Sequence, residues 1–136
     1  MVMKAKGVIL SAIKSGSGKT IASLCLMKAL RDAGFDVIPF KTGPDFIDTS
    51  HYKYISGVDG RNLDTFFMKK DFIYWNIQDA ITEVNAKNPF VVIEGAMGLF
   101  DGYGEKGRGS TAELAKLLGL PVILVIDAKG MAQSIS

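Results

Sequence analysis

The sequence is poor in the residues that build disulfides and metal centres, because its 136 residues include one cysteine and one histidine. A single cysteine excludes an internal disulfide, and the apolar helical position of Cys25 predicts a buried structural thiol. One histidine cannot form a histidine-based metal centre by itself, so either a hydrogen-bonding or a catalytic role stays open for His51.

Long apolar runs and an excess of charge of one sign are also missing. No run approaches the ~20 apolar residues that a membrane-spanning helix needs, and the first residues do not resemble a signal peptide. The net charge is only +2 and the basic residues are scattered, which argues against nucleic acid as a partner. We therefore expect a cytoplasmic protein that binds neither membrane nor nucleic acid.

What the sequence does have is a regular alternation of apolar runs and helical patterns. Strands are expected at 6–13, 35–41, 89–96 and 121–128, with Pro39 at a sheet edge or a strand end, and helices at 19–34, near Asn62, at 72–87 and at 110–119. The last strand is expected to be buried, and residues 42–62 are expected to be irregular. This alternation predicts an α/β domain with a mainly parallel sheet flanked by helices.

A glycine-rich stretch follows the first predicted strand and opens the first predicted helix. It reads Gly16-Ser17-Gly18-Lys19-Thr20, a pattern typical of a phosphate-binding loop (P-loop), in which glycine backbone N–H groups approach phosphate. Lys19 is expected to reach the outer phosphates and Thr20 to bind Mg²⁺. The predicted nucleotide-binding residues are Lys14, Gly16, Ser17, Gly18, Lys19, Thr20 and Ile21.

Two residues depart from the usual form of this loop. Ala12 stands where the first glycine is expected, and Lys14 lies five residues before Lys19. A lysine at that spacing is the signature of septum-site and plasmid-partition ATPases, a branch of P-loop proteins in which it contacts nucleotide phosphate and can reach across a dimer. Lys14 is therefore either a phosphate contact, with homodimerisation, or a solvated surface lysine.

Carboxylates and a lysine stand at the ends of the other predicted strands. Lys41 ends the second strand, and Asp45 and Asp48 follow it. Glu94 ends the apolar run of the third strand, and Asp101 follows seven residues on. Because ligands bind outside the carboxyl ends of parallel strands, these groups are expected near the P-loop. Turn chemistry is the alternative role for the aspartates.

The motifs "PFKTGPDFIDTSHY", "GRNLD", "EGAMGLFDG" and "GSTAELAKLLGLPVILVIDAKGMAQS" resemble those of the cobyrinic acid a,c-diamide synthase family. That family also includes nickel-sirohydrochlorin and hydrogenobyrinic acid a,c-diamide synthases. The resemblance covers essentially residues 1–136. It implies a P-loop fold of the dethiobiotin synthetase-like type.

The resemblance also implies a reaction. The synthetase domain uses ATP and Mg²⁺ to activate tetrapyrrole carboxylates as acyl phosphates, and ammonia from a separate glutaminase domain displaces the phosphate. No glutaminase motif occurs within 1–136, so we expect the chain to be the synthetase part of a longer protein. The alternative is a partition-type nucleotide-switch ATPase, which Lys14 favours.

Residue roles follow from the matching motifs. The resemblance implies Thr20, Asp45 and Glu94 as the Mg²⁺ site. It implies Asp48 and Asp101 at the substrate end, with Lys41 steadying the transferred phosphoryl group. Ser110 and Thr111, at a helix N-terminus, are expected to receive a substrate carboxylate.

Overall fold

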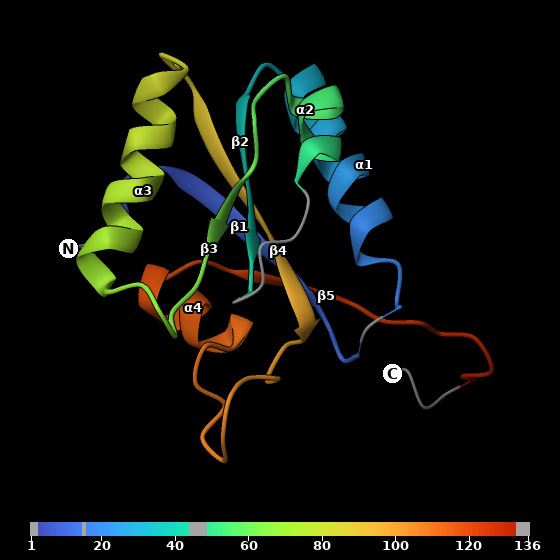
Figure 1. Cartoon of the computed structure of the whole chain (residues 1–136). Helices are drawn as coiled ribbons and strands as arrows, with labels where there is room; N and C mark the ends of the chain where they lie inside the picture. Colours follow the sequence, from blue (N-terminus) through green and yellow to red (C-terminus); the bar gives the residue numbers. More distant parts are fainter. Residues whose placement is uncertain (1–2, 15, 44–48, 133–136) are drawn as a thin grey trace.

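The computed structural model describes residues 3–14, 16–43 and 49–132. Within them the chain forms a five-stranded sheet in the order β3-β2-β4-β1-β5, and every strand pair is parallel. The strands are β1 (Lys6–Ala12), β2 (Asp36–Thr42), β3 (Arg61–Leu63), β4 (Pro89–Gly98) and β5 (Val122–Val125). The predicted α/β class with a parallel sheet is confirmed (Figure 1).

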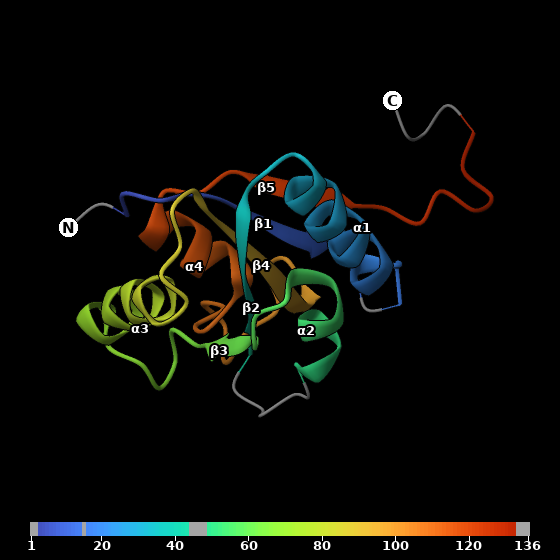
Figure 2. The same cartoon turned by 90° about the horizontal axis from the view of Figure 1, so that it is seen from above.

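Helices cover both faces of this sheet. The helices are α1 (Lys19–Asp32), α2 (Ser50–Ser56), α3 (Lys70–Glu83) and α4 (Thr111–Leu118). Figure 2 shows α1 and α2 on one face and α3 and α4 on the other. Parallel strands joined by helices need this arrangement, because both faces of a parallel sheet carry apolar side chains that must be covered.

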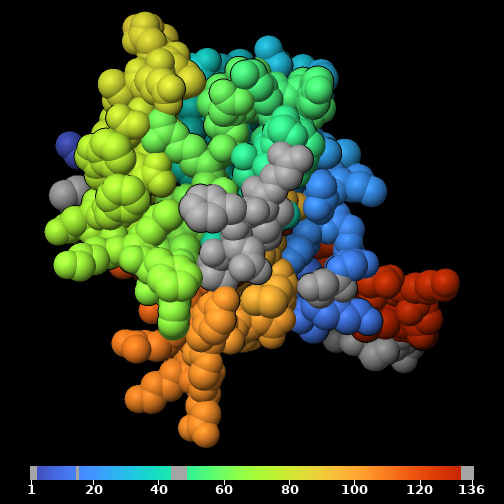
Figure 3. All heavy atoms as spheres, viewed as in Figure 1, coloured from blue at the N-terminus to red at the C-terminus, as the bar shows by residue number. Residues whose placement is uncertain are grey.

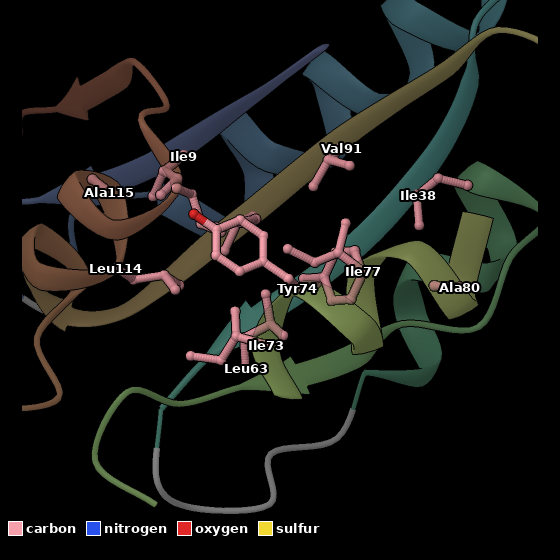
Figure 4. Packing of buried hydrophobic residues seen from close by; sticks show 13 residues of the cluster. Ile9, Ile38, Leu63, Ile73, Tyr74, Ile77, Ala80, Val91, Leu114 and Ala115 are labelled. Carbon is pink, nitrogen blue, oxygen red and sulfur yellow. The ribbon is translucent and has the colours of Figure 1, made fainter. Parts of the chain in front are cut away.

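The alternation of side chains along each strand divides the core into two clusters. Ile9, Val91 and Ile93 point toward α3 and α4, where Ile73 and Leu114 complete the first cluster (Figure 4). The intervening residues point the other way and pack against α1 and α2, as Val8, Leu10, Val37 and Val92 do. On β2 and β4 the same period of two places Lys41 and Glu94 on the α1/α2 face.

Four sequence expectations about the fold need correction. Residues 42–62 are not irregular throughout, because they contain α2 and β3. The helix expected near Asn62 is wrong, since Asn62 lies in β3 and pairs with Lys41. The third helix is Lys70–Glu83 instead of 72–87.

The fourth correction concerns the last strand. β5 pairs only with β1, at the edge of the sheet, and Ile123 and Leu124 are 44% and 42% exposed. It was expected to be buried. Val122 and Val125 are partly buried against the two core clusters, so the described residues cover the strand only in part.

The helix boundaries and Pro39 follow local chemistry. Ser110 caps α4 by accepting a hydrogen bond from the Glu113 N–H, and Gly119 ends the helix in the left-handed conformation at φ 65°, as predicted. Gly34 ends α1 with φ 95°. At Pro39 the strand pairs with β4 only, because β3 joins β2 from Phe40 onward. Pro39 therefore lies at a local edge of the sheet, the kind of position at which a residue without an N–H is found.

Candidate functional site: a phosphate-binding loop beside a buried carboxylate

The P-loop joins β1 to α1 at the carboxyl ends of the strands. Gly16 and Gly18 have φ of 77° and 85°, a left-handed conformation that a residue with a Cβ adopts only at a cost. Gly18 is the N-cap of α1 and provides no side-chain cap, and the first turn carries no acidic residue. The first N–H groups of α1 are therefore free of a competing carboxylate within their own turn, as an anion site requires.

Ala12 and Lys14 occupy very different positions beside this loop. Ala12 is fully buried in β1, and its carbonyl accepts a hydrogen bond from the Leu99 N–H at 2.7 Å. It belongs to the sheet and has no positive φ, so a glycine is not required there. Lys14 is exposed, and its carbonyl accepts a hydrogen bond from the Ser17 hydroxyl at 3.0 Å. Its ammonium group forms no ion pair with a residue of the described ranges.

The P-loop lysine is held by the backbone of β4. The ammonium group of Lys19 donates a hydrogen bond to the Met97 carbonyl. Met97 has φ 52°, unusual for a residue with a side chain. It lies in an irregularity where Leu10 pairs with Glu94 but Ala12 pairs with Gly98. This bulge turns the carbonyl toward the lysine.

Glu94 is the buried centre of the site. It is fully buried within β4, four residues before the last residue of the strand, and its Oε2 accepts hydrogen bonds from the Tyr52 hydroxyl and from the Lys41 ammonium group, the latter at 3.2 Å. Its other oxygen, Oε1, is buried and accepts no hydrogen bond within 3–14, 16–43 and 49–132. A buried carboxylate oxygen without a partner is costly, and Thr20 is the nearby hydroxyl that lowers the pKa of this carboxylate, so Oε1 and Thr20 together offer oxygen atoms to a ligand.

The electrostatics of the site keep this carboxylate charged. Burial opposes the charge, but the Tyr52 hydrogen bond and the Lys41 charge outweigh it, so the pKa of Glu94 lies below its ordinary value. Burial and the Glu94 hydrogen bond both raise the pKa of Tyr52, so its hydroxyl stays a donor. Burial also lowers the pKa of Lys19, and the neighbouring Lys41 adds to this while Glu94 opposes it. Lys19 would thus gain from an additional anion.

The described residues include two of the three predicted Mg²⁺ ligands. Thr20 lies close enough to Glu94 for its hydroxyl to help lower the pKa of that carboxylate. A hydroxyl and a carboxylate oxygen without a partner are donors of the type that Mg²⁺ prefers, so these side chains fit the ion. Asp45 and Asp48 lie outside the described residues. In the described part, no group of at least three His, Cys, Asp or Glu side chains could hold a metal.

Asp101 lies in the loop that follows β4 and is exposed. Its carboxylate accepts a hydrogen bond from the Gly98 N–H at 2.8 Å, and its charge acts on Lys19. The structure therefore brings Asp101 to the P-loop. Its catalytic role stays a prediction.

The predicted carboxylate-binding pair, Ser110 and Thr111, lies at the start of α4 but is buried. The Ser110 oxygen is used as the helix cap. A Cβ added at Gly95 would be 2.7 Å from the Thr111 hydroxyl oxygen, so Thr111 packs tightly against β4. Their substrate role also remains a prediction.

Three further residues with predicted roles or burial lie on α1 and α2. Cys25 was expected to be buried and is exposed, because its side of α1 faces away from the sheet. Ile21, a predicted nucleotide contact, is 71% exposed beside the loop. His51 packs on Tyr52 with ring centroids 4.1 Å apart, and its buried Nε2 has no hydrogen-bond partner in the described part of the chain.

Two residues of this site were not predicted. Tyr52 reaches Glu94 across 42 positions of sequence. It is the last residue of the motif "PFKTGPDFIDTSHY", but no role was predicted for it. Met97 could have been suspected, because it stands between glycines at the end of an apolar strand.

Comparison with known proteins decides the family. The model of a family described as "AAA domain" matches residues 6–134. The chain belongs to this AAA domain family. An AAA domain is a nucleotide-binding domain, which agrees with the P-loop geometry.

Individual relatives agree with the motifs. The chain is 41% identical over 132 residues to a cobyrinate a,c-diamide synthase of Thermoplasma volcanium, covering 97% of this chain and 28% of the relative. It is 45% identical over 131 residues to a hydrogenobyrinate a,c-diamide synthase of Brucella anthropi, covering 96% and 29%. A hydrogenobyrinate a,c-diamide synthase of Mycobacterium bovis is 42% identical over 139 residues, covering 98% and 30%.

The resemblance to a,c-diamide synthases is thus confirmed. The chain spans less than a third of the length of these relatives. No helix in the described part of this AAA domain is long and apolar enough to cross a membrane.

Proposed function

We propose that this AAA domain binds ATP and Mg²⁺ and activates carboxylates of a tetrapyrrole such as cobyrinate, for conversion to the a,c-diamide. The names of the relatives supply the substrate class. The observation that carries the proposal is the charged, fully buried Glu94, whose free Oε1 lies beside the P-loop.

The reaction requires a carboxylate to become an acyl donor. A substrate carboxylate oxygen bonds to the terminal phosphorus of ATP, and the bond from that phosphorus to the ADP oxygen breaks. Ammonia then attacks the acyl carbon and loses a proton, and phosphate leaves with the oxygen that came from the substrate. Neither step needs a covalent nucleophile on the enzyme, and the exposed Cys25 has no such role.

Different residues of the chain would bind the phosphates, stabilise the transferred phosphoryl group and act on the substrate. The N–H groups at Gly18 and the start of α1 would bind the phosphates. Lys19 would leave the Met97 carbonyl and bind the outer phosphates. Lys41, which donates a hydrogen bond to Glu94, would stabilise the transferred phosphoryl group. Asp101 and Asp48 would act at the substrate end.

Thr20 and Glu94, together with Asp45, would hold the Mg²⁺, which neutralises phosphate charge when bound. The Tyr52 hydroxyl occupies one oxygen of Glu94 and leaves the other for the ion. Residues that orient a metal ligand in this way affect metal affinity by about 10–100-fold.

Ammonia would come from glutamine, hydrolysed by a glutaminase domain outside the 136 residues. The proposal accordingly treats the chain as the ATP-dependent part of a cytoplasmic ligase. It would accept free ammonia in place of the glutaminase.

ATP cleavage tests the proposal. Cobyrinate and a high concentration of ammonium are added to the protein with ATP and Mg²⁺, and ADP and amide are both measured. We expect ADP release that depends on cobyrinate, with amide formed in proportion, and none with Lys19→Ala. ATP cleavage that is indifferent to every tetrapyrrole tested would contradict the proposal.

A partition-type switch ATPase is the second candidate, which rests on the exposed Lys14. A switch of this type hydrolyses ATP without a small acceptor and dimerises on binding it. Sedimentation with and without ATP distinguishes the two. An ATP-dependent dimer that Lys14→Ala abolishes would favour the switch.

A further inference from the structure

Four exposed aromatic side chains stand on two loops at the carboxyl ends of the strands. Phe66 and Phe67 come from the β3–α3 connection, and Phe100 and Tyr103 from the loop between β4 and α4. Their exposed fractions are 44%, 70%, 74% and 45%. Phe66 contacts both Phe67 and Tyr103, with ring centroids 4.8 Å and 4.7 Å apart. Exposed aromatic side chains that pack on one another indicate an interaction site.

The two loops are fixed to each other by hydrogen bonds. Tyr103 and Arg108 exchange backbone hydrogen bonds of 2.7 Å and 3.1 Å, which close the hairpin. Glu113 accepts hydrogen bonds from the Thr65 hydroxyl at 3.0 Å and from the Gly109 N–H at 2.6 Å. The aromatic surface is therefore organised before a ligand arrives, which reduces the entropic cost of binding.

Cations border this surface. A hollow of about 530 Å³ is lined by Phe100, Lys106, Arg108 and Lys116, together with Glu105 and Glu113. None of the three cations forms an ion pair with a described residue, whereas Glu113 is occupied by the Thr65 and Gly109 hydrogen bonds. The hollow therefore offers unpaired positive charge beside apolar rings.

The surface is continuous with the phosphate site. Phe100 directly precedes Asp101, whose carboxylate accepts the Gly98 N–H. Leu99 donates its N–H to the carbonyl of Ala12, the last residue of β1. Figure 1 shows the 99–109 loop protruding at the end of the sheet where β2 and β4 finish, and Figure 3 shows the same loop standing out from the molecular surface.

We propose that the aromatic hairpin face, formed by Phe66, Phe67, Phe100 and Tyr103, binds one face of the tetrapyrrole macrocycle, and that Lys106 and Arg108 pair with carboxylates at its rim. This inference rests on the proposed function and adds the residues that recognise the substrate. A tetrapyrrole has a broad, largely apolar ring system with carboxylates around its edge. The aromatic rings match the ring system and the unpaired cations match the edge.

This arrangement would place the macrocycle and its carboxylates in separate parts of the site. The macrocycle would lie on the aromatic hairpin face while the carboxylate to be activated extends past Asp101 toward Lys19 and Lys41. The remaining carboxylates would stay at Lys106 and Arg108, away from the phosphates. Recognition of the ring and activation of the carboxylate would thus use separate residues.

Equilibrium binding of cobyrinate, followed by its absorbance in the presence of ATP and Mg²⁺ but without ammonia, tests the inference. The aromatic variant is Phe67→Ala/Phe100→Ala, which removes the two most exposed rings. Its matched control is Phe72→Ala/Trp75→Ala, because these rings are also exposed and stacked, with centroids 5.5 Å apart, on α3. Arg108→Gln tests the rim, and Lys4→Gln at the opposite end of β1 is its control.

The aromatic variant is expected to bind cobyrinate at least about tenfold more weakly, with ATP affinity unchanged. Arg108→Gln is expected to weaken binding and to reduce its salt dependence. The control variants are expected to bind as the unmodified protein does.

Unchanged cobyrinate affinity in the aromatic variant would overturn the inference. Absence of cobyrinate binding by a chain that binds ATP would overturn it as well. Failure of the proposed function is a separate result, in which cobyrinate binds through this face but adding ammonia yields no amide.

Discussion

The hydroxyl of Tyr52 is the side-chain group whose removal probes the site most selectively. It donates to Glu94 and lies in a fully buried side chain. Tyr52→Phe removes one oxygen atom and leaves the ring packing in place. A hydrogen bond to a charged group contributes about 1.5–3 kcal/mol, so we expect the free energy of unfolding to fall by about 2 kcal/mol.

For a chain of this size each kcal/mol shifts the melting temperature by about 3–5 °C, which predicts a drop of about 6–10 °C. The pH dependence has a definite sign. Because the folded-state pKa of Glu94 is depressed, its contribution to stability is present above its unfolded pKa and is lost as pH falls through the folded pKa. Without the Tyr52 donor the folded pKa rises, so the difference between variant and unmodified protein is largest at neutral pH and shrinks in acid.

Thermal melts at several pH values, without Mg²⁺, measure this difference. Tyr54→Phe is the matched control, because Tyr54 lies on the same helix and is 87% exposed. It should melt as the unmodified protein does. A Tyr52→Phe protein that melts at the same temperature as the control would refute the role given to this hydrogen bond.

Three further predictions concern the same site. Lys19→Ala should lose nucleotide affinity in titration calorimetry while keeping its melting temperature, since burial disfavours the charge on Lys19; retained affinity would mean that phosphate binds elsewhere. Gly60→Ala should cost about 1–3 kcal/mol in urea unfolding, because the added Cβ would lie 2.6 Å from the Tyr52 ring and 2.8 Å from Thr49 Cβ; undiminished stability would show that Tyr52 can move freely. Glu94→Gln should remove the part of acid destabilisation below pH ~4.5 that comes from this carboxylate, and an identical pH profile would contradict the depressed pKa.

Local patterns predicted much of the fold and of the phosphate site. The P-loop and the apolar run that leads to Glu94 follow from short segments, because glycine spacing and apolar runs determine backbone conformation locally. Glu94 was expected near the end of its strand, but the strand continues to Gly98. The cap at Ser110 follows in the same way, since a cap involves residues three positions apart.

Contacts between distant segments were harder to predict. Arg61 of β3 is tied to α3, because it donates hydrogen bonds to the Asn76 side-chain oxygen and to Asp79, both at 2.9 Å. Propensity near Asn62 does not contain that information, so a helix was expected. Tyr52 reaches Glu94 because α2 packs on the same face of the sheet as α1, which is the face that carries the Glu94 side chain.

The predicted burial was wrong where an apolar sequence pattern does not determine which residues pack against a side chain. The composition of β5 is that of a covered strand, but two of its four side chains, Ile123 and Leu124, are exposed. Cys25 fits a helical apolar period, yet the period alone does not determine which side of α1 faces β4.

The central claim is that a tetrapyrrole carboxylate oxygen becomes bonded to the terminal phosphorus of ATP. Cobyrinate labelled with a heavy oxygen isotope in its carboxylates, incubated with the protein, ATP, Mg²⁺ and ammonium, tests this directly by mass spectrometry of the released phosphate. The account predicts one labelled oxygen in the phosphate for each amide formed. Unlabelled phosphate released together with amide would contradict the acyl phosphate, and with it the role assigned to the P-loop and Glu94.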